Sequence, residues 1–285
     1  MHSSASQRRA LSSASLWRLA ERTAFALLVA LILIPALFVF YWMIVSSLKP
    51  ESEIYAFPPR WVFLPTFKNY FAAVQMTPFF RYLFNSIVIA LGSSVLGLII
   101  GLPAAYSIAR YRQERLSLAI LVARIMPGVA YLVPLFVLFL RLRMVGSYTS
   151  LILSHLVVTF PLTVWIMVGF FEDLPGELME AASIDGCSSI GSFLRVAVPL
   201  TLPGIATAGI LSFIFSWNDF KMALILSNSE TRTLPVAVFN FVHEASLEWG
   251  PMMAYATIIA LPVMLLTLLV QRHIVSGLTM GGVKS

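Results

Sequence analysis

Charged residues are scarce in this chain. Only 11% of its 285 residues are Asp, Glu, Lys or Arg, whereas 59% are hydrophobic, and the mean hydropathy is +0.88. Soluble domains carry about 25% charged residues, so this sequence has too little polar surface for a water-soluble globule. The composition therefore predicts an integral membrane protein that has lipid as its main solvent.

Several catalytic signatures are missing as well. Cys187 is the single cysteine, which excludes an internal disulfide and a cysteine-based metal cluster. No GxxxxGK[ST] loop occurs, so the chain is not expected to hydrolyse ATP itself. HExxH and GxSxG are also missing, and the adjacent Ser154 and His155 do not define a catalytic geometry. We therefore predict no enzymatic activity, no metal site and no cofactor bound by this chain.

Strict alternation of apolar and polar residues, which a transmembrane barrel requires, is missing too. The sequence instead shows long apolar runs, and about 20 such residues cross a ~30 Å hydrocarbon core as a helix. We predict an all-α membrane protein with a six-transmembrane-helix bundle, and internal prolines such as Pro127 predict kinks. The six spans are expected near Thr23–Leu48, Leu83–Ile108, Ser117–Leu140, Ser150–Phe171, Leu202–Leu226 and Pro251–Gln271.

These spans divide the chain into four segments. Residues 1–22 form an N-terminal segment, and residues 23–82 hold the first transmembrane helix and an outer loop. Residues 83–271 form the core transmembrane domain, whose longest polar loop is 172–200, and residues 272–285 form a tail.

Basic residues indicate the orientation of the spans, because short cytoplasmic loops are enriched in Lys and Arg. The bias is modest, but it places both termini and the 172–200 loop in the cytoplasm. The net charge of +6 does not indicate nucleic-acid binding, because the basic residues are scattered between apolar runs. The basic residues assigned to the cytoplasmic side include Arg8, Arg9, Arg18, Arg22, Arg110, Arg112 and Arg115. Those that fall on the opposite side are Lys49, Arg60, Lys68, Arg81, Arg141 and Arg143.

The 172–200 loop interrupts the hydrophobic runs and holds five of the chain's thirteen acidic residues. Pro175 suits the first turn of a helix, and the acids that follow it favour the helix dipole. Gly186 suits a left-handed C-terminal cap, and Ser188 or Ser189 can begin a second short helix. The pattern predicts a helix–glycine–helix hairpin outside the membrane, with a plain solvated connector as the alternative.

Part of this loop resembles a known motif. Glu180-Ala181-Ala182, Gly186 and Val196-x-Val198-Pro199 resemble the EAA loop of permease subunits in binding-protein-dependent ABC importers, with valines replacing isoleucine and leucine. Met126-Pro127-Gly128, Trp217-Asn218-Asp219-Phe220 and the tail from Gln271 to Lys284 are similar to the MalG-type carbohydrate permeases. The resemblance covers most of the chain from the second span onward.

The resemblance implies one permease subunit of a carbohydrate ABC importer in the cytoplasmic (inner) membrane of a prokaryote. Its partners would be membrane lipid, a second homologous permease, an extracytoplasmic solute-binding protein and an ATPase dimer, which would hold ATP and Mg²⁺. The EAA hairpin would be a coupling helix that docks on the ATPase through Glu180, Ala181, Ala182, Asp185 and Gly186. The tail would contact the ATPase as well, through Gly277, Leu278, Thr279, Gly281 and Gly282.

Other solutes and other classes stay open. A permease for glycerol phosphate or a polyol would carry the same motifs. A secondary transporter would instead have inverted repeats and ion-coupling groups, and it would have no use for an EAA hairpin.

Four residues inside the predicted spans are candidates for the substrate pathway, because polar groups at membrane depth are costly. Trp217, Asn218 and Asp219 combine an aromatic ring for a sugar face with groups that bind hydroxyls. Arg124 lies in the third span. The alternatives are a polar cluster that holds the fifth span to the partner permease and, for Arg124, an internal ion pair or snorkelling. His155 is predicted to be a packed, hydrogen-bonding residue.

Overall fold

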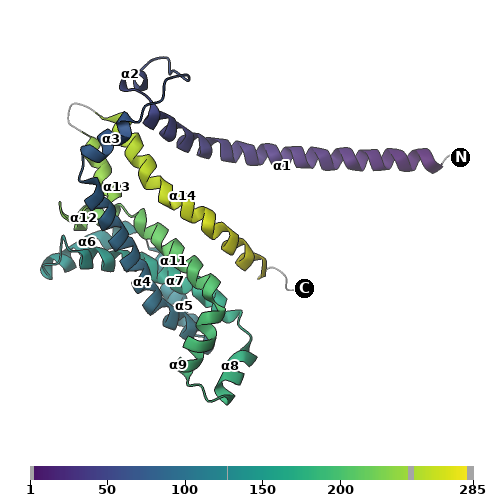
Figure 1. The fold of residues 1–285 in the computed structure, drawn as a ribbon. Coiled ribbons are helices and arrows are strands. Elements are labelled where there is room, and N and C mark those ends of the chain that lie inside the picture. Colours follow the sequence, from purple (N-terminus) through teal and green to yellow (C-terminus); the bar gives the residue numbers. More distant parts are fainter. Residues whose placement is uncertain (1–2, 127, 243–246, 281–285) are drawn as a thin grey trace.

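The computed structural model describes residues 3–126, 128–242 and 247–280, and this part of the chain contains helices and no strand. Figure 1 shows an elongated bundle from which one long helix extends. The elements are α1 (Ser3–Leu48), α2 (Glu51–Ile54), α3 (Lys68–Gln75), α4 (Phe79–Tyr111), α5 (Glu114–Ile125), α6 (Gly128–Arg141), α7 (Tyr148–Glu172), α8 (Gly176–Ile184), α9 (Ser189–Ser192), the π-helix η1 (Phe193–Ala197), α10 (Val198–Leu200), α11 (Leu202–Trp217), α12 (Lys221–Leu226), α13 (Leu234–Ala237), the 3-10 helix η2 (Val238–Phe241) and α14 (Trp249–Met280).

Among the described residues, four helices are long and apolar enough to cross a membrane alone, namely α1, α4, α7 and α14. Two bent pairs reach the same length and apolarity. Helices α5 and α6 meet at 90°, and the helical stretch 189–200 meets α11 at 79°. When each bent pair counts as one span, the described helices give up to six spans, which is the number that the sequence predicts.

The third predicted span, Ser117–Leu140, is wrong as a single helix. Helix α5 ends at Ile125, and Met126 has an extended backbone with φ −58° and ψ 133°. Proline disfavours helical backbone at the residue before it, and Pro127 follows Met126 in the sequence. The hydroxyl of Tyr131 in α6 donates a hydrogen bond to the carbonyl of Ala123 in α5 and ties the two halves together.

The fifth predicted span, Leu202–Leu226, is also wrong as one helix. Helix α11 ends at Trp217, and α12 begins only at Lys221. The cause is Asp219, whose Oδ1 accepts hydrogen bonds from the backbone N–H groups of Met222 (3.0 Å) and Ala223 (3.4 Å). A carboxylate that binds free N–H groups starts a new helix, so the apolar run is broken here.

The centre of the bundle is the packing of α4 against α7, with α11 lying along both. Small residues on α4 allow this close approach. A Cβ atom on Gly101 would lie 2.8 Å from Cγ2 of Thr163, and one on Gly97 would lie 3.2 Å from Oγ1 of Thr159. Gly97 and Gly101, spaced as a GxxxG pair, therefore allow the close approach of the two central helices.

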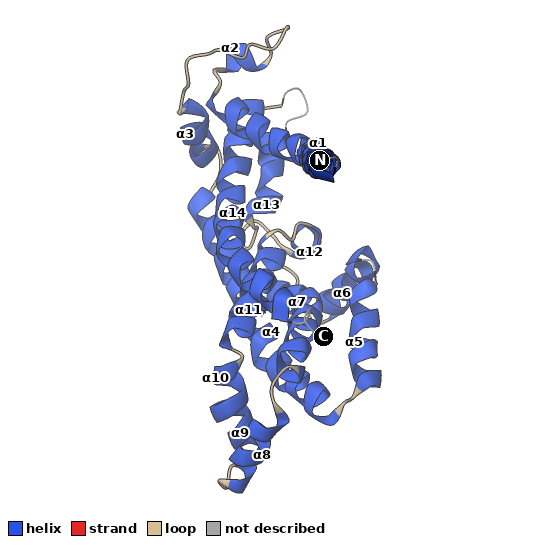
Figure 2. Cartoon of the chain, turned by 90° about the vertical axis from the view of Figure 1, so that its right-hand side faces the viewer, coloured by secondary structure: helices blue, strands red, loops and turns tan. Residues whose placement is uncertain are grey.

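The two ends of the bundle differ. Figure 2 shows α2 and α3 at one end and the short helices α8 to α10 at the opposite end. Helix α1 leaves the bundle beside the start of α14 and extends away from it (Figure 1), and none of its most apolar window is buried. Its exposed apolar surface requires lipid or another membrane protein as a neighbour.

Candidate functional site

Helices α8 and α9 form a hairpin that we call the arm (residues 176–192). Between them Gly186 has φ +82°, in the left-handed region that favours glycine. The Oγ of Ser188 accepts a hydrogen bond from the N–H of Gly191 at 3.1 Å and caps α9. Pro175 takes the N-cap position of α8, one residue before the expected first turn. The structure thus confirms the predicted helix–glycine–helix geometry and its Ser188 cap.

One face of the arm is packed against the bundle. Met179 and Ala182 are both buried, and Met179 lies in an apolar cluster with Ile108 of α4 and Phe171 of α7. The hydroxyl of Tyr106 also donates a hydrogen bond to Sδ of Met179 at 3.6 Å. Met179 therefore anchors the arm to the two central helices.

The opposite face of the arm is open. Four of the five predicted docking residues, Glu180, Ala181, Asp185 and Gly186, are exposed. The fifth, Ala182, is buried, so of the two adjacent alanines only Ala181 lies on the open face.

Apolar side chains lie beside these acids, and the sequence analysis did not single them out. Ile184 is 86% exposed just before the turn, and Ile190 is 71% exposed just after it. The sequence held one signal for this apolar surface, namely an isoleucine on each side of Gly186 in a loop rich in acidic residues. Exposed apolar groups rimmed by charge are typical of a protein-binding surface.

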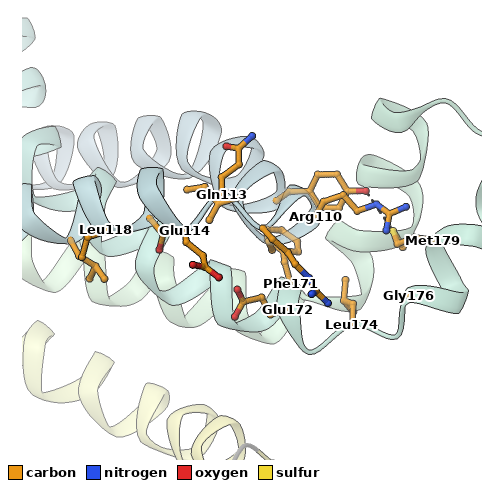
Figure 3. A pocket seen from close by; sticks show the side chains of 15 residues that line it. Arg110, Gln113, Glu114, Leu118, Phe171, Glu172, Leu174, Gly176 and Met179 are labelled. Carbon is orange, nitrogen blue, oxygen red and sulfur yellow. Dashed lines mark hydrogen bonds between the residues drawn. The ribbon is translucent and has the colours of Figure 1, made fainter.

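A hollow of about 920 Å³ lies beside the arm, among the ends of α4, α5 and α7 (Figure 3). Its lining carries charges of both signs, from Arg110 and Arg112 at the end of α4, Glu114 of α5 and Glu172 of α7.

The residues proposed for the substrate pathway have different surroundings. Trp217 is only 3% exposed, and its indole N–H donates to the carbonyl oxygen of Ile259 in α14 at 3.2 Å. Asp219 is half-buried and caps α12 as described above. Asn218 is exposed at the end of α11, with its amide nitrogen bonded to the carbonyl of Ile214. Packing accounts for Trp217 and Asp219, whereas Asn218 remains accessible.

His155 lies in a buried polar cluster between α4, α7 and α11. Its Nδ1 is 2.7 Å from Oγ of Ser216, which in turn accepts a hydrogen bond from Oγ of Ser93 at 2.8 Å. Its Nε2 is 3.5 Å from Oδ1 of Asp219. The prediction of a packed, hydrogen-bonding histidine is confirmed, and the cluster holds the end of α11 against the two central helices.

Arg124 lies in the last turn of α5, close to the bend. Its guanidinium is 4.7 Å from the ring centroid of Trp165 in α7, a cation–π distance. The ring of Trp165 is half exposed. Arg124 therefore has an aromatic packing partner within the chain, which the sequence did not predict.

The predicted tail contacts lie at the end of the chain. Gly277, Leu278 and Thr279 fall within α14, whereas Gly281 and Gly282 lie outside the described residues. Within the described ranges, no group of three or more His, Cys, Asp or Glu side chains has the proximity to hold a metal ion.

Comparison with known proteins gives concordant matches. Residues 95–280 match the family model described as "Binding-protein-dependent transport system inner membrane component". The sulfoquinovosyl glycerol transport system permease protein SmoH of Agrobacterium fabrum is 40% identical, covering 90% of this chain and 91% of that protein. The trehalose transport system permease protein SugB of Mycobacterium tuberculosis is 36% identical, covering 92% and 97%.

A solved structure shares the fold. It belongs to a bacterial ABC transporter involved in the import of the acidic polysaccharide alginate, and it superposes with a TM-score of 0.75 at 19% identity. The match covers 91% of this chain and 97% of that one.

Proposed function

This chain belongs to the family of binding-protein-dependent transport system inner membrane components, and we propose that it is a permease subunit of an ATP-driven importer that moves a carbohydrate across the inner membrane. The observation that carries the proposal is its similarity to a sulfoquinovosyl glycerol permease and a trehalose permease over 90% and 92% of its length. Full-length similarity of this kind supports the same molecular role, with the individual sugar left to experiment.

The exposed face of the arm is the proposed docking site for the ATPase. It presents Glu180, Ala181 and Asp185 beside the apolar Ile184, and it projects from the end of the bundle (Figure 2). Such a surface suits a cleft with an apolar floor and a basic rim. ATP and Mg²⁺ would be bound by that partner, because this sequence has no phosphate-binding loop.

Met179 gives the arm a way to act on the membrane-embedded helices. It links α8 to α4 and α7 within one apolar cluster. A close-packed interior is hardly compressible, so a displacement of α8 is transmitted to the helices that Met179 contacts. ATP-driven closure of the motor would therefore move these two helices together with the arm. The tail residues Gly277, Leu278, Thr279, Gly281 and Gly282 are proposed as a second contact with the same motor.

The other proposed partners are a second permease subunit and an external binding protein. Helix α1 offers an apolar surface that its own chain leaves uncovered. The end of the bundle opposite the arm, with α2 and α3 (Figure 2), is the one proposed to face the binding protein. We propose that the arm's end of the bundle and both termini face the cytoplasm, because Arg110 and Arg112 lie at that end and basic residues gather on the cytoplasmic side.

Copurification and an ATPase assay test the proposal. The tagged chain is expressed with its neighbouring transport genes, purified, and reconstituted with binding protein loaded with trehalose, sulfoquinovosyl glycerol or glycerol phosphate. We expect a second permease and an ATPase to copurify, and one of the two sugars to stimulate ATP hydrolysis.

Charge reversal locates the docking site in the same assay. Glu180→Lys on the exposed face should lower the stimulated hydrolysis at least about tenfold, given the cost of a like-charge contact at an interface. Glu172→Lys carries the same charge change off the arm and should leave stimulation intact. Uptake without any ATPase would show a secondary transporter instead, and stimulation by glycerol phosphate alone would move the substrate to another class.

A further inference from the structure

An open hollow lies where α11 gives way to α12. Its volume is about 400 Å³, and it is distinct from the hollow beside the arm. Figure 1 shows α11, α12, α13 and α14 converging in this region. The lining residues are Asn218, Phe220, Pro235, Val238, Phe239, Ala256, Ile259 and Ala260.

The hollow lies where a helix too short to cross a membrane comes to its end. Helix α11 has 16 residues, which rise about 24 Å at 1.5 Å per residue, so an α11 that begins at one membrane surface ends at Trp217 before it has crossed a ~30 Å hydrocarbon core. Non-helical backbone is tolerated at that depth only where it is buried in protein or lines a cavity. Discontinuous helices at this depth commonly form the binding sites of transporters.

Hydrogen bonds on both sides stabilise the break between α11 and α12. The Asp219 carboxylate starts α12 by capping it, and His155 and Ser216 fix the end of α11 from the other side. With Trp217 turned inward toward Ile259, the next residue, Asn218, is exposed at the hollow. Of these two neighbouring residues, Trp217 is buried and Asn218 is exposed, so Asn218 is the one whose side chain can contact a solute in the hollow.

The chemistry of the lining suits the face and edge of a sugar ring. The rings of Phe220 and Phe239 are paired with centroids 5.4 Å apart, and Phe239 is 55% exposed. Asn218 provides an amide that binds hydroxyl groups. No charged side chain is among the lining residues, so the hollow suits an uncharged hydroxylated ring and offers no counter-charge to an ionic group.

We propose that Asn218, Phe220 and Phe239 form a carbohydrate-contact site on the translocation pathway of this subunit. The site rests on the proposed function, because it holds the sugar after the binding protein has opened. Weakening the site lets more sugar return to the outside during each cycle, so the amount imported per ATP falls while hydrolysis continues. That ratio separates a pathway residue from a residue needed for assembly.

The test uses the complete importer in proteoliposomes, with whichever of trehalose or sulfoquinovosyl glycerol stimulates the wild-type ATPase. Phe239→Leu and Asn218→Ala should each lower the ratio of sugar imported to ATP hydrolysed about two- to tenfold, the effect of one lost stacking contact or hydrogen bond. Stimulated hydrolysis should stay at the wild-type rate. Phe239→Tyr, which keeps the ring, should keep the ratio.

Phe215→Leu is the matched control, since Phe215 is a half-exposed phenylalanine of α11 that does not line the hollow. An unchanged ratio in both Phe239→Leu and Asn218→Ala overturns the site while leaving the importer function standing. Equal losses of uptake and hydrolysis in these variants also overturn it, in favour of a contact with the partner permease. If the wild-type complex imports neither sugar, the proposed function fails and the site fails with it.

Discussion

Gly186 offers the sharpest perturbation of the proposed docking arm. Its φ of +82° is a conformation that L-residues adopt at a cost, and no atom lies within 4 Å of the position that a Cβ would take. Gly186→Val therefore adds no steric clash with the rest of the chain. The whole effect of the substitution is backbone strain at the turn between α8 and α9.

The size of that strain sets the expected result. A left-handed backbone costs an L-residue roughly 1–2 kcal/mol, and the chain relieves this cost by moving to negative φ and redirecting α9. The population with the native turn then falls by at most about 5- to 30-fold, and the apparent affinity for the ATPase falls by the same factor. Gly186→Asn should lose much less, because asparagine tolerates the left-handed region.

The assay measures ATPase binding to the permease pair in lipid nanodiscs, together with hydrolysis stimulated by loaded binding protein. Gly176→Ala in the same arm is the control, since a Cβ there also meets nothing within 4 Å and its φ is not positive. The reasoning is refuted if Gly186→Val binds the ATPase as tightly as wild type. It is equally refuted if Gly176→Ala or Gly186→Asn loses as much affinity as Gly186→Val.

Three further substitutions test the packing. Gly204→Ala places a Cβ 2.5 Å from the Phe170 ring and should destabilise the purified complex by about 1–3 kcal/mol in thermal unfolding. Gly209→Ala, which meets only the end of a flexible leucine, should not. Asp219→Ala should cost about 1 kcal/mol by removing the α12 cap, and Asp219→Asn should restore stability in the same measurement if capping is its role. Asn85→Leu removes the hydrogen bonds that Asn85 makes with the carbonyls of Glu230 and Arg232 and with the Tyr148 hydroxyl, so it should cost about 2–3 kcal/mol and speed proteolysis of the 227–233 loop.

Local signals in the sequence predicted local structure well. Apolar runs identified four of the six predicted spans as single helices, and the spacing of Gly186 and Ser188 identified the turn and cap of the arm, because these features depend on residues close in the chain. The break at Met126 also had a local signal in the following Pro127, which predicted a kink but not a 90° bend. The angle depends on contacts with α6 that the sequence does not specify.

Direction of side chains was harder to predict, because it depends on tertiary neighbours. Ala181 and Ala182 are chemically identical, yet only Ala182 faces the bundle, since α8 turns the side of Met179 toward α4 and α7. Trp217 and Asn218 show the same problem within the membrane. A tryptophan inside a predicted span suggested sugar stacking, but α14 supplies a backbone carbonyl that accepts a hydrogen bond from its indole N–H, and the ring is buried.

The contacts around α11 indicate which helices respond together to the arm. Met179 joins the arm to α4 and α7 at one end of the bundle. Ser216, through Ser93 and His155, joins the other end of α11 to the same two helices. Because both ends are tied to α4 and α7, the arm and these three helices form one packed body. Displacement of the arm is then expected to act where that body meets α14, at the contact of Trp217 with Ile259, one residue from the accessible Asn218.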